Sequence, residues 1–156
     1  MQNDISGNCI EGNSFYVSVE GSNDNQGTNA SPFKTIGHAL SLRMNNGIAT
    51  TIHILEGVYS PSTNGETFPI EMFSFVNLIG QGEEVTIIDA EQTDRVILME
   101  NCQNNIISDL TITGGNSPDE YSDPGGGIYL ISSNPSLIHV TIVDNTAYFG
   151  GGLFLE

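Results

Sequence analysis

Short apolar runs recur along this chain in two series that advance together, and no helical pattern separates them. The first series begins at residues 85, 110 and 140, with the runs Val85-Thr86-Ile87-Ile88, Leu110-Thr111-Ile112-Thr113 and Val140-Thr141-Ile142-Val143. The second series comprises residues 96–99, 128–131 and 153–155. The steps are 25 and 30 residues in the first series and 32 and 25 in the second. Both long steps cross residues 117–124, so a single insertion explains them.

Two series of strands with a common step predict the stacked coils of a parallel β-helix, an all-β solenoid. Each strand would then pair with its counterpart in the next coil at a spacing of roughly 4.8 Å. Side-chain alternation predicts an aliphatic interior and an outward row of threonines. The inward positions are Val85, Ile87, Leu110, Ile112, Val140 and Ile142, and the outward row is Thr86, Thr111 and Thr141. A β-sandwich also has many short strands, but its hairpins would not explain the shared step.

An amphipathic helix is predicted ahead of the coils. Ser31 is a favourable N-cap residue, and Pro32 suits the first helical position, where a missing N–H costs nothing. One helix face follows at residues 33, 36, 40 and 44, and Gly47 supplies a stop. Such a helix would cover the open core and the unpaired edge of the first coil.

These patterns divide the chain into three parts. Residues 1–14 are predicted to be a polar leader or linker, residues 15–50 an amino-terminal cap of strand, loop and helix, and residues 51–156 the coils. The last coil ends within a strand of the second series, so we expect the chain to be part of a longer protein. Its terminal edge is a candidate for self-association.

Charge excludes two classes of partner. Lys and Arg together number 3 and Asp and Glu 19, which gives a formal net charge of −16. A nucleic acid or an anionic membrane surface would need basic residues that this chain lacks. The sequence has no apolar stretch long enough to insert into a membrane. Cys9 and Cys102 have no metal-ligand spacing, and the sequence leaves their disulfide state open.

The cap and the coils share short motifs with a known group of proteins. The motifs are Phe15-Tyr16-Val17-Ser18, Gly21-Ser22-Asn23-Asp24, Ser31-Pro32-Phe33-Lys34-Thr35-Ile36, and the runs 76–82 and 107–116. They resemble exported right-handed β-helix proteins, which include pectate-lyase-like and chondroitinase-B-like polysaccharide lyases. The resemblance implies a right-handed parallel β-helix with an amino-terminal capping helix. It also implies an extracellular or cell-surface location, although no secretory signal is visible. It is specific for the fold and not for an activity.

Lyases of this group usually use Lys or Arg as the base that abstracts a proton, often with calcium on the substrate acid. Only Lys34, Arg43 and Arg95 are basic here. Lys34 and Arg43 fall in the predicted helix, whereas Arg95 starts a coil strand and is a candidate substrate-binding residue. No catalytic residue carries over from the resemblance. If the protein is a lyase, its catalytic residues are expected outside this stretch.

The insertion at residues 117–124 interrupts the repeat, and insertions in solenoids often form a binding face. Asp119, Glu120 and Asp123 place three carboxylates close together, which a calcium ion would stabilise. Tyr121 offers a flat surface to a sugar ring. We therefore predict weak calcium binding by the carboxylates and substrate binding by Tyr121, although a solvated acidic loop without ligand also fits this composition.

Three functions follow as hypotheses. The first is the amino-terminal part of an exported carbohydrate-active or carbohydrate-binding β-helix protein, polysaccharide-lyase-like if it is an enzyme, with a polysaccharide or cell-surface glycan as partner. The second is a non-catalytic surface or adhesion protein, because residues 144–147 and 150–153 are similar to the repeats of chlamydial polymorphic outer-membrane proteins. The third is ice binding through the outward threonine row.

Overall fold

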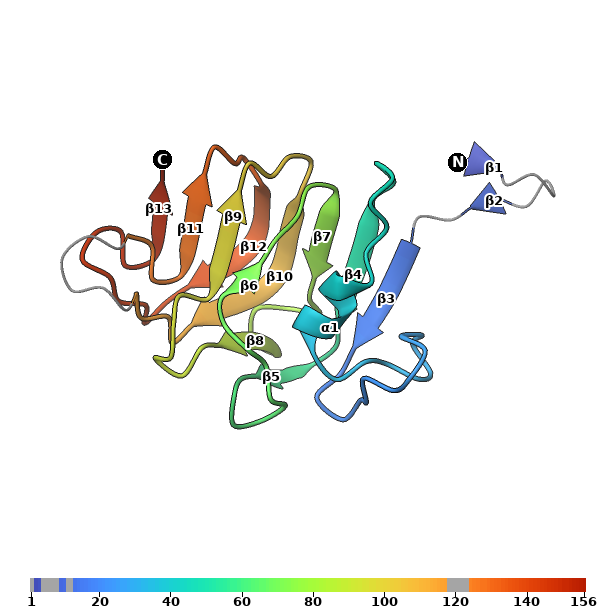
Figure 1. Ribbon diagram of the computed structural model, residues 1–156. Coiled ribbons are helices and arrows are strands. Elements are labelled where there is room, and N and C mark those ends of the chain that lie inside the picture. Colours follow the sequence, from blue (N-terminus) through green and yellow to red (C-terminus); the bar gives the residue numbers. More distant parts are fainter. Residues whose placement is uncertain (1, 4–8, 11–12, 118–123) are drawn as a thin grey trace.

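The computed structural model describes residues 2–3, 9–10, 13–117 and 124–156, and its architecture is a right-handed parallel β-helix (Figure 1). Most elements are strands: β1 (Gln2–Asn3), β2 (Cys9–Ile10), β3 (Asn13–Val17), β4 (Thr50–Ile54), β5 (Gly57–Tyr59), β6 (Ile70–Glu71), β7 (Val76–Ile79), β8 (Thr86–Asp89), β9 (Ile97–Glu100), β10 (Ile106–Thr113), β11 (Ile128–Ile131), β12 (Ser136–Ile142) and β13 (Leu153–Leu155). Helix α1 (Ile36–Ser41) is short, and none of the described residues form a helix that could span a membrane.

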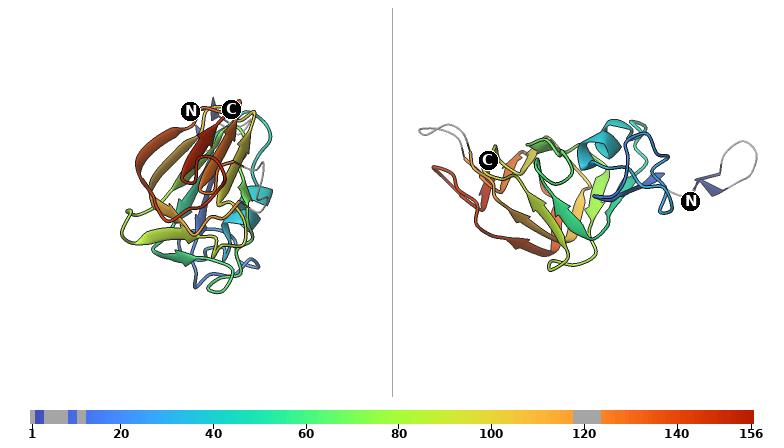
Figure 2. Two further views of the ribbon diagram at one scale, coloured as in Figure 1. Left: turned by 90° about the vertical axis from the view of Figure 1, so that its left-hand side faces the viewer. Right: turned by 90° about the horizontal axis from the view of Figure 1, so that it is seen from below.

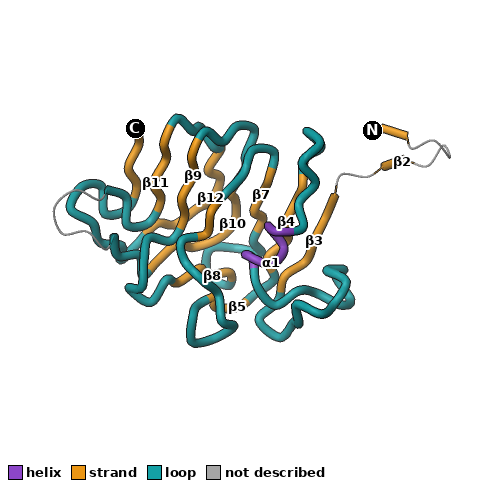
Figure 3. Tube along the Cα trace, in the orientation of Figure 1, coloured by secondary structure: helices purple, strands orange, loops and turns teal. Residues whose placement is uncertain are grey.

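The coils are built from two sheets of parallel strands. The first sheet has the order β3-β4-β7-β10-β8-β5, with β12 also paired to β10. Strands β10 and β12 run the full width of this sheet, whereas earlier coils divide the same path into two shorter strands (Figure 3). The long strands bend where Asp109 and His139 adopt positive φ angles of 56° and 48°. The second sheet has the order β13-β11-β9-β6.

The sequence predicted the strand β8 one residue out of register. Ile87 pairs with Thr111 and Ile88 with Ile112, so Thr86 and Ile88 point into the core. Val85 is instead 42% exposed and Ile87 is half-buried, which is the opposite of the predicted alternation. A slip of one residue reverses every side chain of a strand. The inner face tolerates Thr86 because its hydroxyl accepts a hydrogen bond from the backbone N–H of Gln81 at 3.0 Å.

Later coils follow the predicted register. Leu110 pairs with Val140 and Ile112 with Ile142. Leu110 and Ile112 are fully buried, and Val140 and Ile142 pack against the same core. In the second sheet the pairing is Ile97 with Ile128 and then Leu153, so the first of these strands is again shifted by one residue from the predicted alignment.

Helix α1 begins later than predicted. Its N-cap is Thr35, whose hydroxyl accepts a hydrogen bond from the backbone N–H of His38. Ser31 and Pro32 lie outside the helix, because the backbone N–H of Phe33 donates to the carbonyl oxygen of Tyr16 and Phe33 forms a parallel bridge to β3. Pairing with a neighbouring strand therefore overrides a favourable local capping sequence.

The buried face of the cap is nevertheless the one predicted. Phe33, Ile36 and Leu40 are all buried, and α1 contacts β3, β4 and β6 at the amino-terminal end of the stack (Figure 2). Met44 lies beyond the end of the helix and is 54% exposed, so its predicted place on this face is wrong. The predicted boundary between residues 14 and 15 falls inside β3, which pairs with β4 along its whole length.

A buried carboxylate holds the start of α1. Glu66 is 2% exposed, and its two carboxylate oxygens accept hydrogen bonds from the backbone N–H groups of Ile36 at 2.7 Å and Gly37 at 3.0 Å. Since the first N–H groups of a helix have no partner within it, this side chain satisfies two of them. Burial raises the pKa of Glu66 above its ordinary value, and the hydrogen bonds oppose that shift only in part.

This raised pKa makes the contribution of Glu66 to stability depend on pH. Below the pKa of the unfolded chain, about 4.3, the carboxyl is protonated in both states. As pH rises through the folded value, the unfolded state ionises more readily, so stability from this group is lost. We expect the unfolding free energy of the wild type relative to Glu66→Gln to fall as the pH rises above about 4.3. Urea unfolding of both proteins over a series of pH values above this point measures it, and a relative stability that rises with pH would contradict the assignment.

The strand β13 lies at one edge of the second sheet. Leu153 and Leu155 pair with the inward-facing Ile128 and Leu130, yet Leu155 is 63% exposed. Self-association of the 156-residue chain through this edge remains a prediction. We expect Leu155→Lys to lower the association constant, because a charge would have to be desolvated. Analytical ultracentrifugation over a concentration series tests this, and a wild type that stays monomeric at high concentration would contradict it.

Candidate functional site

The outward face of the second sheet carries aromatic and acidic side chains. We call it the second-sheet face, and it consists of Glu71, Leu98, Glu100, Tyr129, Ile131, Phe154 and Glu156. Strand register places Glu71 beside Leu98, Leu98 beside Tyr129, and Tyr129 beside Phe154. Glu71, Leu98, Tyr129 and Phe154 therefore form one row across four coils, at roughly 4.8 Å per strand.

Two aromatic rings lie at the carboxyl-terminal end of this row. The ring centroids of Tyr129 and Phe154 are 5.8 Å apart with an edge-to-face angle of 67°. The Tyr129 hydroxyl donates a hydrogen bond of 2.6 Å to a carboxylate oxygen of Glu156. An aromatic ring beside hydrogen-bonding groups is suited to a ligand that has both apolar and hydroxyl-bearing surfaces.

Arg95 stands next to this aromatic pair. Its guanidinium carbon lies 4.9 Å from the Tyr129 ring centroid, and its Nε is 3.9 Å from a carboxylate oxygen of Asp94. The residue is only 7% exposed, so it contacts the ring more than it contacts solvent. The structure thus places the predicted substrate-binding arginine beside Tyr129, which the sequence did not single out.

Toward the cap, the second-sheet face continues into a groove around Phe73. Three adjoining cavities of about 370, 410 and 300 Å³ share this residue in their linings. The Arg43 guanidinium covers the Phe73 ring at 3.2 Å from its centroid and donates to the carbonyl oxygen of Leu40. The smallest cavity reaches Leu98, so the groove and the aromatic row are contiguous.

The remaining predicted site residues lie outside the described part of the chain. Asp119, Glu120, Tyr121 and Asp123 fall within residues 118–123, so calcium binding and sugar contact by them stay predictions. Calorimetric titration with calcium of the wild type and an Asp119→Asn, Asp123→Asn variant is their test. Among the described residues no three His, Cys, Asp or Glu side chains are grouped as a metal site.

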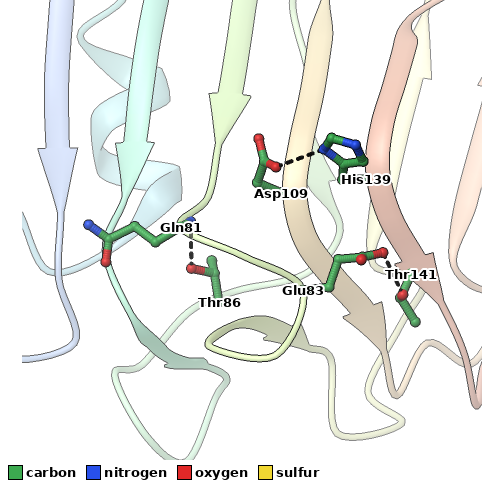
Figure 4. Close-up of polar contacts among 6 residues, drawn as sticks. All are labelled: Gln81, Glu83, Thr86, Asp109, His139 and Thr141. Carbon is green, nitrogen blue, oxygen red and sulfur yellow. Dashed lines mark hydrogen bonds and ion pairs between the residues drawn. The ribbon is translucent and has the colours of Figure 1, made fainter.

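The first sheet carries a polar cluster at the bend of β10 and β12 (Figure 4). A hydrogen bond of 3.2 Å joins Nδ1 of His139 and Oδ1 of Asp109. Hydrogen bonds from the Ser108 and His139 side chains lower the pKa of Asp109. Thr141 donates to the Glu83 carboxylate at 2.7 Å. His139 and Thr141 are exposed and Asp109 and Glu83 are half-buried, so these groups form a network at the surface.

The same cluster corrects the predicted ice-binding face. Thr86 points into the core, so the outward row is Ile87, Thr111 and Thr141. The Thr111 hydroxyl donates to the carbonyl oxygen of Glu83, and the Thr141 hydroxyl donates to its carboxylate. The loop that carries Glu83 therefore contacts both threonines, and the flat threonine row predicted from the sequence does not form.

Comparisons with known proteins match a family model and two curated proteins. A family model described as a protein of unknown function (DUF1565) matches residues 19–93. A metabotropic glutamate receptor-like protein P of Dictyostelium discoideum is 35% identical over 128 residues, which is 80% of this chain and 8% of that protein. The uncharacterized protein YwoF of Bacillus subtilis (strain 168) is 30% identical over 141 residues, which is 86% of this chain and 28% of that protein.

A crystal structure of a pectin methylesterase variant in complex with a hexasaccharide has the same architecture. It superposes with a TM-score of 0.60 at 17% identity, over 87% of this chain and 44% of the esterase chain. The chain thus spans less than a third of each curated relative and less than half of this structural neighbour. Together with the strand topology, these matches identify the chain as a parallel β-helix protein.

Proposed function

We propose that the second-sheet face binds a glycan, and that the 156-residue polypeptide is part of an exported or cell-surface carbohydrate-binding β-helix protein. The observation that carries the proposal is the in-register row that ends in Tyr129 and Phe154, supported from the side by Arg95. A flat ring packs against the C–H face of a sugar, while the nearby carboxylate of Glu156 accepts hydrogen bonds from sugar hydroxyls.

The length of the row suits an extended ligand. Tyr129 and Phe154 lie at one end, and the groove around Phe73 lies at the other. A sugar chain laid along the coil axis would contact side chains from each of the strands β6, β9, β11 and β13 in turn. The complex of the pectin methylesterase with a hexasaccharide supports the choice of ligand class only through the shared fold.

Charge argues against a polyuronate as the ligand. The face presents Glu71, Glu100 and Glu156, and the chain as a whole carries a net charge of −16. A substrate with a carboxylate on every sugar would be repelled by this surface. The proposal therefore assigns binding of a glycan without carboxylates to these residues, and assigns no bond-breaking step to them. A lyase or esterase activity of a longer protein would need residues beyond those described.

The test is calorimetric titration of the chain with three hexasaccharides: chitohexaose, cellohexaose and hexagalacturonate. We expect measurable binding of at least one neutral hexamer and a dissociation constant for hexagalacturonate at least about tenfold weaker. Tyr129→Ala should weaken neutral binding by about tenfold or more. The control is Tyr16→Ala, because Tyr16 is also half-buried and stacked, against His53 at 4.6 Å, on the other sheet. Equal effects of the two substitutions, or tighter binding of hexagalacturonate, would contradict the proposal.

A further inference from the structure

The groove end of the second-sheet face holds two carboxylates whose charges are not neutralised. Glu71 and Glu100 are both exposed, and among the described residues neither carboxylate has a hydrogen-bond or ion-pair partner. Both line the cavity of about 300 Å³, together with Met72, Phe73 and Leu98. No basic side chain lines that cavity.

The two carboxylates stand on either side of an apolar floor. Glu71 is in register with Leu98, and Glu100 is two residues further along the strand that contains Leu98. One strand spacing of about 4.8 Å and a rise of about 6.6 Å over two residues place the two backbones about 8 Å apart. A single sugar ring on Leu98 and Phe73 would therefore have a carboxylate within reach on each side.

Arg43 shares the cavity of about 370 Å³ with Glu100 and that of about 410 Å³ with Glu71, but it does not line the cavity that holds both carboxylates. Its guanidinium lies over the Phe73 ring and donates to the carbonyl oxygen of Leu40, and among the described residues it forms no ion pair with Glu71 or Glu100. A sugar hydroxyl can donate a hydrogen bond to either carboxylate, but it leaves the negative charge in place. A ligand with a positive charge would gain attraction that is strongest where a groove limits access of water.

We propose that this groove selects glycans whose sugars carry a free, protonated amino group, such as glucosamine polymers. The inference rests on the proposed function, because it names the sugar class that the same face takes. The ring packs on Leu98 and Phe73, and the ammonium group donates hydrogen bonds to Glu71 or Glu100. N-acetylation removes the charge and leaves the ring unchanged, so free and acetylated oligomers of one length form a matched pair of ligands.

The experiment titrates the full 156-residue chain with hexaglucosamine and with chitohexaose, its acetylated counterpart, by calorimetry at low and high salt. We expect hexaglucosamine to bind at least about tenfold more tightly at low salt, and we expect the difference to shrink as salt screens the charges. A Glu71→Gln, Glu100→Gln variant should lose this preference. The control Glu84→Gln removes an exposed carboxylate of the first-sheet loop and should retain the preference.

The outcomes separate this inference from the proposed function. Equal affinity of the wild type for the two hexamers, or a preference that persists in the double variant, would overturn the selection for amines and leave glycan binding in place. Failure of both hexamers and of cellohexaose to bind would overturn glycan binding itself. Circular dichroism of each variant checks that the coils remain folded.

Discussion

Replacement of Leu40 by aspartate should lower the free energy of unfolding by about 4 kcal/mol. Leu40 is 3% exposed, and α1 packs it against β3, β4 and β6 at the end of the coil stack. The substitution removes apolar contacts from the core and buries a carboxyl group that has no partner there. Since the cap covers the first coil, its loss would also expose the edge of β3 and the apolar interior beneath it.

Urea unfolding followed by circular dichroism measures this change. The matched control is Ser41→Asp, because Ser41 is the adjacent residue of the same helix and is exposed. We expect this control to change stability by less than about 0.5 kcal/mol. A Leu40→Asp variant with the wild-type midpoint would show that the helix does not cap the core.

Replacement of Gly127 by alanine should destabilise the chain by about 3 kcal/mol or more. A Cβ atom at this position would lie 2.3 Å from the carbonyl oxygen of Gly152 in the next coil. That distance is far shorter than any real contact, and the obstructing atom is backbone rather than a flexible side chain. The backbones also share hydrogen bonds here, because the N–H of Gly127 donates to Gly151. The coils would have to separate at this corner, which would break pairing between β11 and β13.

The control is Gly152→Ala, because Gly152 occupies the position of Gly127 in the next coil. A Cβ atom at Gly152 would meet only the Ile142 side chain, at 3.4 Å, which is an ordinary contact. We expect a change in unfolding free energy of less than about 1 kcal/mol. Thermal unfolding of the two variants side by side tests the contrast. Similar melting temperatures for both would contradict the view that Gly127 allows close approach between coils.

The sequence was sufficient to predict the architecture but not every register. The common step requires strands to stack coil upon coil, and this repetition survives large differences in the loops. The strand at residues 86–89 was placed one residue out because its pattern fits both alignments. Val85 and Ile87 offer an apolar face, and so do Thr86 and Ile88 once the threonine hydroxyl has a partner. The sequence pattern does not show that the Thr86 hydroxyl has hydrogen-bond partners in the backbone of Gln81 and Ile54.

The start of the helix was mispredicted for a similar reason. Ser31-Pro32 is a favourable capping sequence, yet Phe33 pairs with β3 and keeps that segment extended. The site was partly visible in the sequence, since Tyr129 and Phe154 occupy the same position of the 25-residue repeat. Glu71 and Glu100 could not be placed together, because they meet only through the register of β6 and β9.

The central claim, that a glycan binds along the second-sheet face, is tested most directly by mapping where the ligand contacts the chain. Backbone amide resonances of the isotope-labelled protein, followed by NMR during titration with chitohexaose or hexaglucosamine, report this location. We expect the largest shift changes at Leu98, Tyr129 and Phe154, with little change along β4 and β7 of the opposite sheet. Saturable changes confined to the first sheet, or no changes with either hexamer, would contradict the claim.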